Sequence, residues 1–381
     1  STASLGYLGI VVGAVFAGLI YVLISALVKF AGVGWINKIM PPVVIGPTVA
    51  IIGLSLSANA IADLMKGSVT VGQTEWIAKK VDGIMQAVAV TKNVPLASPF
   101  IALLCGLLTL IVVVICSVYG NKTMKLIPFI IGILAGYALA ALFTVLGNAF
   151  SIDALKIIDF GKFADMEWIP SFVFLKIFDG GFGTQNIGAY IGSIAVAYVP
   201  VAFVVFAEHI ADHKNLSEII GSDLLENPGL NRTLLGDGVG SIVGAVFGGC
   251  PNTTYGESVA CVAITGNASV ITIFVTALLC IACSFIGPFV TFLATIPSCV
   301  MGGVCMALYG FIAVSGLKML QGVNLSDNKN LFVVSSILIA GVGGMVVRIG
   351  EIQITSVACA LILGIIVNLI CNIKSKNREN Q

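Results

Sequence analysis

Two short segments concentrate the residues that could bind a polar ligand or carry a proton. The first reads A-E-H-I-A-D-H and contains Glu208, His209, Asp212 and His213. Glu208 and Asp212 are separated by four residues and therefore share one face of a helix. Burial favours the protonated form of a carboxylate, and a second carboxylate nearby favours it further. The pattern predicts a proton-coupling site with Glu208, Asp212 and His209 as candidates. The alternative for Asp212 and His213 is a solvated helix end.

The second segment reads P-N-T-T-Y-G-E and ends at Glu257 inside an apolar stretch. Pro, Asn and Gly interrupt helices, so 250–266 is expected to be a broken crossing with a short half-strand at 252–256. Irregular backbone at membrane depth is tolerated only where it is buried in protein or lines a cavity. A planar ring with alternating N–H and C=O edges would complement such backbone groups, and a carboxylate would accept from the ring N–H groups. The spacing alone does not name the ring.

Lipid must surround the elements that position these segments. The 381 residues are 58% hydrophobic and 10% charged, with a mean hydropathy of +1.07, whereas soluble domains are about 45–50% apolar and about 25% charged. The net charge is only +1, so the chain has no excess of positive charge to attract a polyanion, and no nucleic-acid partner is expected. The 10 cysteines lie in or beside apolar runs, which argues against a disulfide framework.

Ten apolar segments are expected to cross the bilayer, whose core takes about 20 helical residues to span. With the broken segment they make eleven crossings of an all-α polytopic membrane protein, with long loops at 63–97 and 148–186. Lys and Arg in the C-terminal tail and in short loops of the same side favour a cytoplasmic position for that side. The ten segments are 5–28, 41–62, 98–119, 126–147, 187–211, 234–249, 268–296, 299–320, 330–348 and 352–373.

A repeated motif indicates internal symmetry. The pattern P-x-x-V-(I/M)-G begins at Pro41 and again 256 residues later at Pro297, each time opening a span. The two crossings are expected to run in opposite senses, as in many secondary transporters; a chance match of six positions is the alternative. At this offset three crossings of the first repeat would precede Ser1, so the sequence is expected to be N-terminally incomplete, with 11 of 14 spans present. The alternative is that the protein begins at Ser1.

Enzyme and pump signatures are missing from the sequence. It lacks the phosphate-binding pattern G-x-x-x-x-G-K-(S/T) and the patterns H-E-x-x-H and G-x-S-x-G. We therefore expect neither an enzyme nor an ATP-driven pump, and neither a metal site nor a cofactor apart from the coupling proton. An anion channel of similar architecture would need a basic group facing the broken crossing, and the sequence places none there.

The chain resembles the nucleobase–ascorbate transporter family of nucleobase–cation symporters, and within it the bacterial uracil branch. The resemblance covers nearly the whole chain and is most specific at A-E-H-I, at N-P-G-L-N-R, at P-N-T-T-Y-G-E and at V-M-G-G. It implies two inverted repeats of seven spans folded as a core domain and a gate domain. The implied core segments are 1–30 and 187–296, the latter with the substrate site, and the implied gate segments are 31–186 and 297–381.

The resemblance also implies the site and its substrate. Glu208 and Glu257 would hydrogen-bond a nucleobase, and Tyr255 and Gly256 would contact it. The implied activity is proton-coupled uptake of uracil across the bacterial cytoplasmic (inner) membrane, with a homodimer left open. The alternatives are a xanthine or uric acid permease, which usually carries Gln where Glu257 stands, and a truncated copy that transports nothing. The chain departs from the family pattern at Asp212, where uracil carriers often have His.

Overall fold

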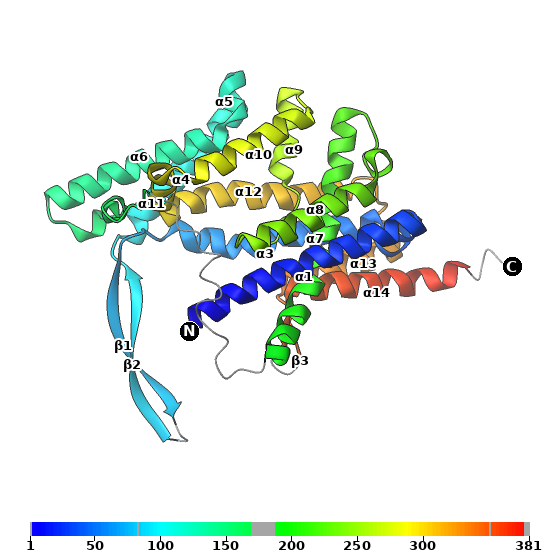
Figure 1. Ribbon diagram of the computed structural model, residues 1–381, viewed down its shortest axis with the longest axis horizontal. Coiled ribbons are helices and arrows are strands. Elements are labelled where there is room, and N and C mark those ends of the chain that lie inside the picture. The colour runs from blue at the N-terminus through cyan, green and yellow to red at the C-terminus, as the bar shows by residue number, and fades with distance from the viewer. Residues whose placement is uncertain (1, 82–83, 169–186, 350–351, 377–381) are drawn as a thin grey trace. The chain divides into compact units, whose positions relative to one another are not determined.

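The computed structural model describes residues 2–81, 84–168, 187–349 and 352–376, which are mostly helical (Figure 1). Several helices begin at a proline, which is preorganised for the first helical turn. The α-helices are α1 (Thr2–Ala31), α2 (Gly34–Ile39), α3 (Pro42–Leu64), α4 (Pro99–Tyr119), α5 (Lys122–Leu126), α6 (Pro128–Ala149), α7 (Ile187–Ile220), α8 (Leu230–Val246), α9 (Gly256–Thr265), α10 (Val270–Ser284), α11 (Gly287–Thr295), α12 (Ser298–Lys318), α13 (Asn328–Val342) and α14 (Ser356–Lys376). Short 3-10 helices η1 (Asp153–Leu155) and η2 (Phe160–Phe163) and a kinked turn η4 (Leu225–Gly229) join them.

The crossing expected at 268–296 consists of two helices, α10 and α11, joined at a sharp bend. Within the described residues, 6 helices are long and apolar enough to cross a bilayer, and the bent pair α10 and α11 would make 7. That pair is bent by 89°, and Pro288 stands in the first turn of α11, where proline ends one helix and opens another. The helix expected at 330–348 stops at Val342. The count of eleven crossings stays a prediction.

The loop expected at 63–97 is instead a β-hairpin, so the fold is mostly helical rather than all-α. Strands β1 (Thr70–Val81) and β2 (Ile84–Pro95) pair antiparallel from Thr70↔Pro95 to Val81↔Ile84 and form the long ribbon of Figure 1. Both strands are rich in Val, Ile and Thr, which fit a pleated strand. A second, shorter hairpin consists of β3 (Val347–Ile349) and β4 (Ile352–Ile354). The loop expected at 148–186 lies partly outside the described residues.

The broken crossing has irregular backbone followed by a short helix. Residues 251–255 carry no ladder pairing in the described structure, and the backbone of Tyr255 is extended, with φ −112° and ψ 92°. Helix α9 begins at Gly256 and ends at Thr265, and it is capped by Gly266, whose φ of +66° suits a residue without a Cβ. The expected half-strand is therefore extended backbone without a β partner in the part described.

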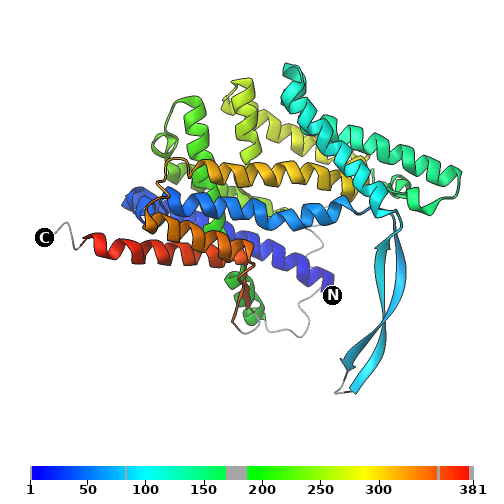
Figure 2. The same ribbon diagram turned by 180° about the vertical axis from the view of Figure 1, so that it is seen from behind.

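The chain forms two compact units. The first comprises 1–56, 172–268 and 309–381, and the second comprises 57–171 and 269–308. In the first unit α1 packs against α8 and α7, and α13 packs against α14, the orange and red helices of Figure 2. In the second unit α4 packs against α6. The core and gate segments expected from the resemblance follow different boundaries, and because they concern movement during transport, that division stays a prediction.

Two glycine contacts allow α1 and α8 to approach closely in the first unit. A Cβ on Gly18 would lie 2.6 Å from the carbonyl oxygen of Gly238, and a Cβ on Gly238 would lie 2.8 Å from the carbonyl oxygen of Gly18. Small residues at helix interfaces are the usual means of close packing in membrane proteins. Because α8 carries a carboxylate directed at α7, this contact also bears on the site.

Candidate functional site

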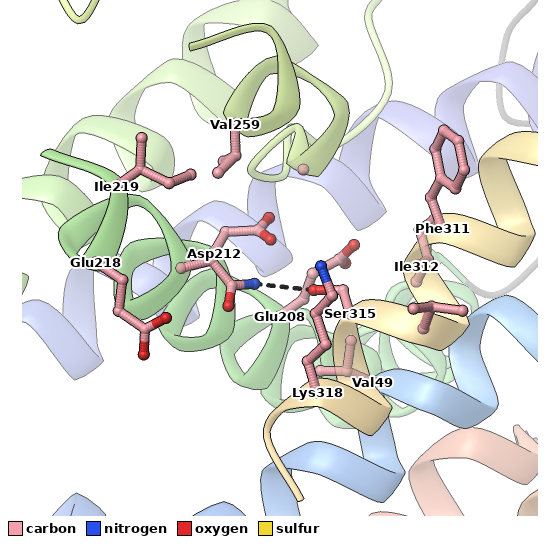
Figure 3. Close-up of a pocket in the computed structure, with 13 residues that line it drawn as sticks. Val49, Glu208, Asp212, Glu218, Ile219, Val259, Phe311, Ile312, Ser315 and Lys318 are labelled. Atoms are coloured by element: carbon pink, nitrogen blue, oxygen red, sulfur yellow. Dashed lines mark hydrogen bonds between the residues drawn. The ribbon is translucent and has the colours of Figure 1, made fainter. Parts of the chain in front are cut away.

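One face of α7 forms a wall of a cavity in the first unit. The cavity has a volume of about 380 Å³, within the ~300–1,000 Å³ typical of small-molecule sites. Glu208, Asp212, Asn215 and Ile219 line it, and their spacing of four, three and four residues follows one face of a helix. Figure 3 shows the carboxylates of Glu208 and Asp212 on this wall. The predicted pairing of these two residues on one helix face is confirmed.

Helices α9 and α12 supply the other walls. Gly256 and Val259 come from α9, and Phe311, Ser315 and Lys318 come from α12. The lining therefore combines the carboxylates and the amide of α7 with the hydroxyl and ammonium groups of α12 and with apolar side chains (Figure 3). Such a mixture of apolar surface and a few polar groups is typical of sites for small organic molecules.

The carboxylate of Asp212 lies against the start of α9. A Cβ on Gly256 would lie 3.1 Å from Oδ1 of Asp212, and Asp212 is only 8% exposed. The amino end of a helix carries a partial positive charge that stabilises a carboxylate. The glycine thus leaves room for a buried negative charge where the irregular segment enters its helix.

His209 belongs to a different face of α7. Its Nδ1–H donates to Oδ2 of Asp237 on α8 at 2.8 Å, and its Nε2 lies 3.1 Å from Oγ1 of Thr233. The ring is 1% exposed and stacks on His213 at a centroid distance of 4.1 Å. The ring of Tyr21 meets it edge to face at a centroid distance of 6.2 Å. The buried imidazole of His209 is thus paired with a partly exposed carboxylate of α8.

The structure brings some of the predicted site residues together and separates others. Glu208, Asp212 and Gly256 line one cavity. His209 faces α8, because successive helical residues point about 100° apart. Tyr255 is 62% exposed and is not among the described residues that line the cavity. Glu257 stands in the first turn of α9, and its side chain lies outside the described part of the structure.

Two groups of polar residues were missed by the sequence reasoning. Asp237 lies within a segment expected to be a span, and its charge there was a usable signal because ionisable residues in spans are usually functional. The second group is Ser315 and Lys318 on α12, whose part in the cavity depends on tertiary packing and left no local signal. Within the described residues, no group of three His, Cys, Asp or Glu is placed to hold a metal ion.

Comparison with known proteins decides the family. A family model named Xan_ur_permease, described as "Permease family", matches residues 2–350. The chain belongs to this permease family. The uracil permease of Bacillus subtilis is 35% identical over 365 residues, covering 94% of this chain and 74% of that protein. The uracil permease of Escherichia coli K12 is 32% identical over 380 residues, covering 99% and 77%. A putative pyrimidine permease of the same strain is 24% identical over 366 residues, covering 95% and 71%.

The family match confirms the resemblance read from the sequence. The permease is a transport protein and not an enzyme, which removes the membrane-enzyme alternative. Its apolar helices make it a multi-pass membrane protein. The roles of Glu208, Glu257, Tyr255, Gly256, Asp212 and His209 remain predictions.

Removing the carboxylate of Asp237 should destabilise the permease. In Asp237→Ala, the buried Nδ1–H of His209 loses the acceptor at 2.8 Å, and an unsatisfied buried donor costs about 1–3 kcal/mol. Thermal unfolding of the purified protein in detergent should show a lower Tm. Asp237→Asn is the matched control, because its amide oxygen still accepts, and it should lower the Tm less. Equal melting of Asp237→Ala and the wild type would contradict the pairing.

Proposed function

We propose that this permease imports uracil together with protons across a bacterial cytoplasmic membrane. The observation that carries the proposal is the cavity lined by two carboxylates of α7, of which that of Asp212 lies against the amino end of α9. Ring N–H groups of a pyrimidine need acceptors, and carboxylates supply them. The relatives named uracil permease, which are bacterial and match nearly the whole chain, support the choice of base and of membrane.

In this proposal Glu208 accepts a hydrogen bond from a ring N–H group, and Glu257 accepts a second. Backbone groups of Tyr255 and Gly256 contact the base at the start of α9, where irregular backbone enters the helix. The coupling proton is taken up at Glu208, with Asp212 as a neighbouring carboxylate and His209 as a further acceptor. The two carboxylates in one cavity support this assignment, because neighbouring carboxylates can share a proton.

The proposal includes an inverted repeat, which helix contacts support. In one unit a Cβ on Gly46 would lie 2.9 Å from the carbonyl oxygen of Gly316, and in the other a Cβ on Gly302 would lie 2.9 Å from that of Ala60. Gly302 stands 256 residues after Gly46, and Gly316 stands 256 residues after Ala60. The same offset therefore relates the two contacts, as it relates the two P-x-x-V-(I/M)-G motifs. Rocking of a core against a gate built on such repeats would expose the cavity to each side in turn.

Uptake of radiolabelled uracil tests the proposal. The permease is expressed in a bacterial strain that lacks its own uracil uptake, and accumulation is measured with and without a proton gradient. We expect gradient-dependent accumulation that unlabelled uracil suppresses and unlabelled xanthine or uric acid does not. Suppression by xanthine or uric acid in place of uracil would reassign the substrate to purines. Uptake that persists after collapse of the gradient would remove the proton from the mechanism.

A further inference from the structure

A hydrogen bond crosses the cavity from one wall to the other. Nδ2 of Asn215 on α7 donates to Oγ of Ser315 on α12 at 2.9 Å, and both residues line the cavity. Figure 3 draws this bond as a dashed line between the two walls. It joins residues 100 positions apart in the sequence, so it connects two helices that have no local reason to stay together at this point.

The position of the bond divides the cavity along α7. Asn215 follows Glu208 by seven residues, which corresponds to about 10 Å along a helix. Beyond it the lining contains Glu218 on α7 and Lys318 at the end of α12. Figure 3 shows the side chain of Lys318 extending into the cavity beside Ser315. A ligand held at Glu208 and leaving toward these charged residues must pass the side chains of Asn215 and Ser315.

We propose that Asn215 and Ser315 form a latch that holds the α7 and α12 walls of the cavity together and must open for a base to pass. The inference rests on the proposed function, because it assigns the latch to the path of the transported base. Neither residue is needed to bind the base at Glu208. The pair sets how often the walls separate, and it therefore affects the rate of passage rather than the affinity.

Loss of the bond should have a measurable and moderate effect. One net intramolecular hydrogen bond corresponds to a factor of about 2 to 12 in an equilibrium constant. In Ser315→Ala and in Asn215→Ala, the fraction of molecules with separated walls should rise by this factor. Ser315→Thr keeps a hydroxyl group and should stay within about twofold of the wild type.

Thiol labelling reports on the latch without any substrate. Val259 lines the cavity from α9, so Val259→Cys places a small reporter there. The purified permease is reacted with a hydrophilic maleimide, and labelling at position 259 is quantified by peptide mass spectrometry. Cys250, which is exposed, serves as the reference on the same molecule. Adding Ser315→Ala should raise the ratio of the two labelling rates about 2- to 12-fold.

Ser336→Ala provides the matched control. Its hydroxyl donates to the carbonyl oxygen of Val333 in its own helix, so its removal should leave the labelling ratio within about twofold. Exchange of labelled uracil across proteoliposomes should change with Ser315→Ala by the same factor as labelling. If the wild type does not bind uracil, the proposed function is wrong. The labelling ratio still tests the latch in that case, because it is measured without substrate.

Two results would overturn the latch. In the first, both alanine variants leave the labelling ratio within about twofold of the wild type, whatever their Tm. In the second, Ser315→Ala weakens uracil binding without changing labelling, which would make Ser315 a contact of the base.

Discussion

Glu208→Gln should reduce uracil uptake by about 10- to 150-fold. Glutamine has the size of glutamate, but it carries no charge and does not exchange a proton near neutral pH. Hydrogen bonds to a charged group contribute about 1.5–3 kcal/mol, which corresponds to this range of rates. Initial uptake of radiolabelled uracil at equal amounts of permease in the membrane measures the effect. Because the side chain lines the cavity, the loss should accompany weaker binding of uracil to the purified protein.

The control for this substitution is Glu226→Gln in the turn before α8. Glu226 is exposed and is not among the described residues that line the cavity, so uptake should stay within about twofold of the wild type. Wild-type uptake in Glu208→Gln would remove this carboxylate from both binding and coupling. Unchanged uracil binding with uptake lost would instead restrict Glu208 to the movement of the proton.

Gly53→Val should prevent the permease from reaching a folded state. A Cβ at position 53 would clash with the carbonyl oxygen of Tyr309 and would lie 2.7 Å from the backbone nitrogen of Ala313. Backbone atoms of a packed helix have no room to yield, and overpacking costs about 1–3 kcal/mol for an added methylene in less constrained cores. The two further methyl groups of valine increase the clash. Size-exclusion chromatography of the detergent extract should show aggregate in place of a monodisperse peak.

Gly310→Val is the matched control on the same helix as Tyr309. A Cβ at Gly310 has no neighbour within 4 Å, so this variant should elute as the wild type does. A monodisperse peak for Gly53→Val would show that α3 and α12 do not pack this closely in the membrane protein.

Local patterns in the sequence predicted most of α7, which continues to Ile220 beyond the expected end at 211. They also predicted the pairing of its carboxylates, because an i, i+4 relation depends only on helix geometry. The bend between α10 and α11 was also marked, by Gly287 and Pro288, but the surrounding apolar run outweighed that signal. The β1–β2 ribbon was missed because a polar stretch between two spans was taken for a loop although β-branched residues recur in it.

Contacts between residues far apart in the sequence could not be predicted from it. His209 meets Asp237 across 28 positions, and Asn215 meets Ser315 across 100. Such pairings follow from which helices pack together, and neither periodicity nor composition of a single segment specifies that. The sequence therefore identified His209 as a chemical group but did not identify the helix that it faces.

The close contact of α1 with α8 makes the chemistry of His209 depend on a residue that touches no ligand. Gly238, which meets Gly18 through bare backbone, immediately follows Asp237 in α8. Any side chain at position 18 would push α8 outward and would carry the Asp237 carboxylate away from the 2.8 Å contact with His209. Tyr21, one turn further along α1, makes an edge-to-face contact with the same ring. The close spacing of α1 and α8, which the two glycines permit, thus keeps the Asp237 carboxylate within hydrogen-bonding distance of His209.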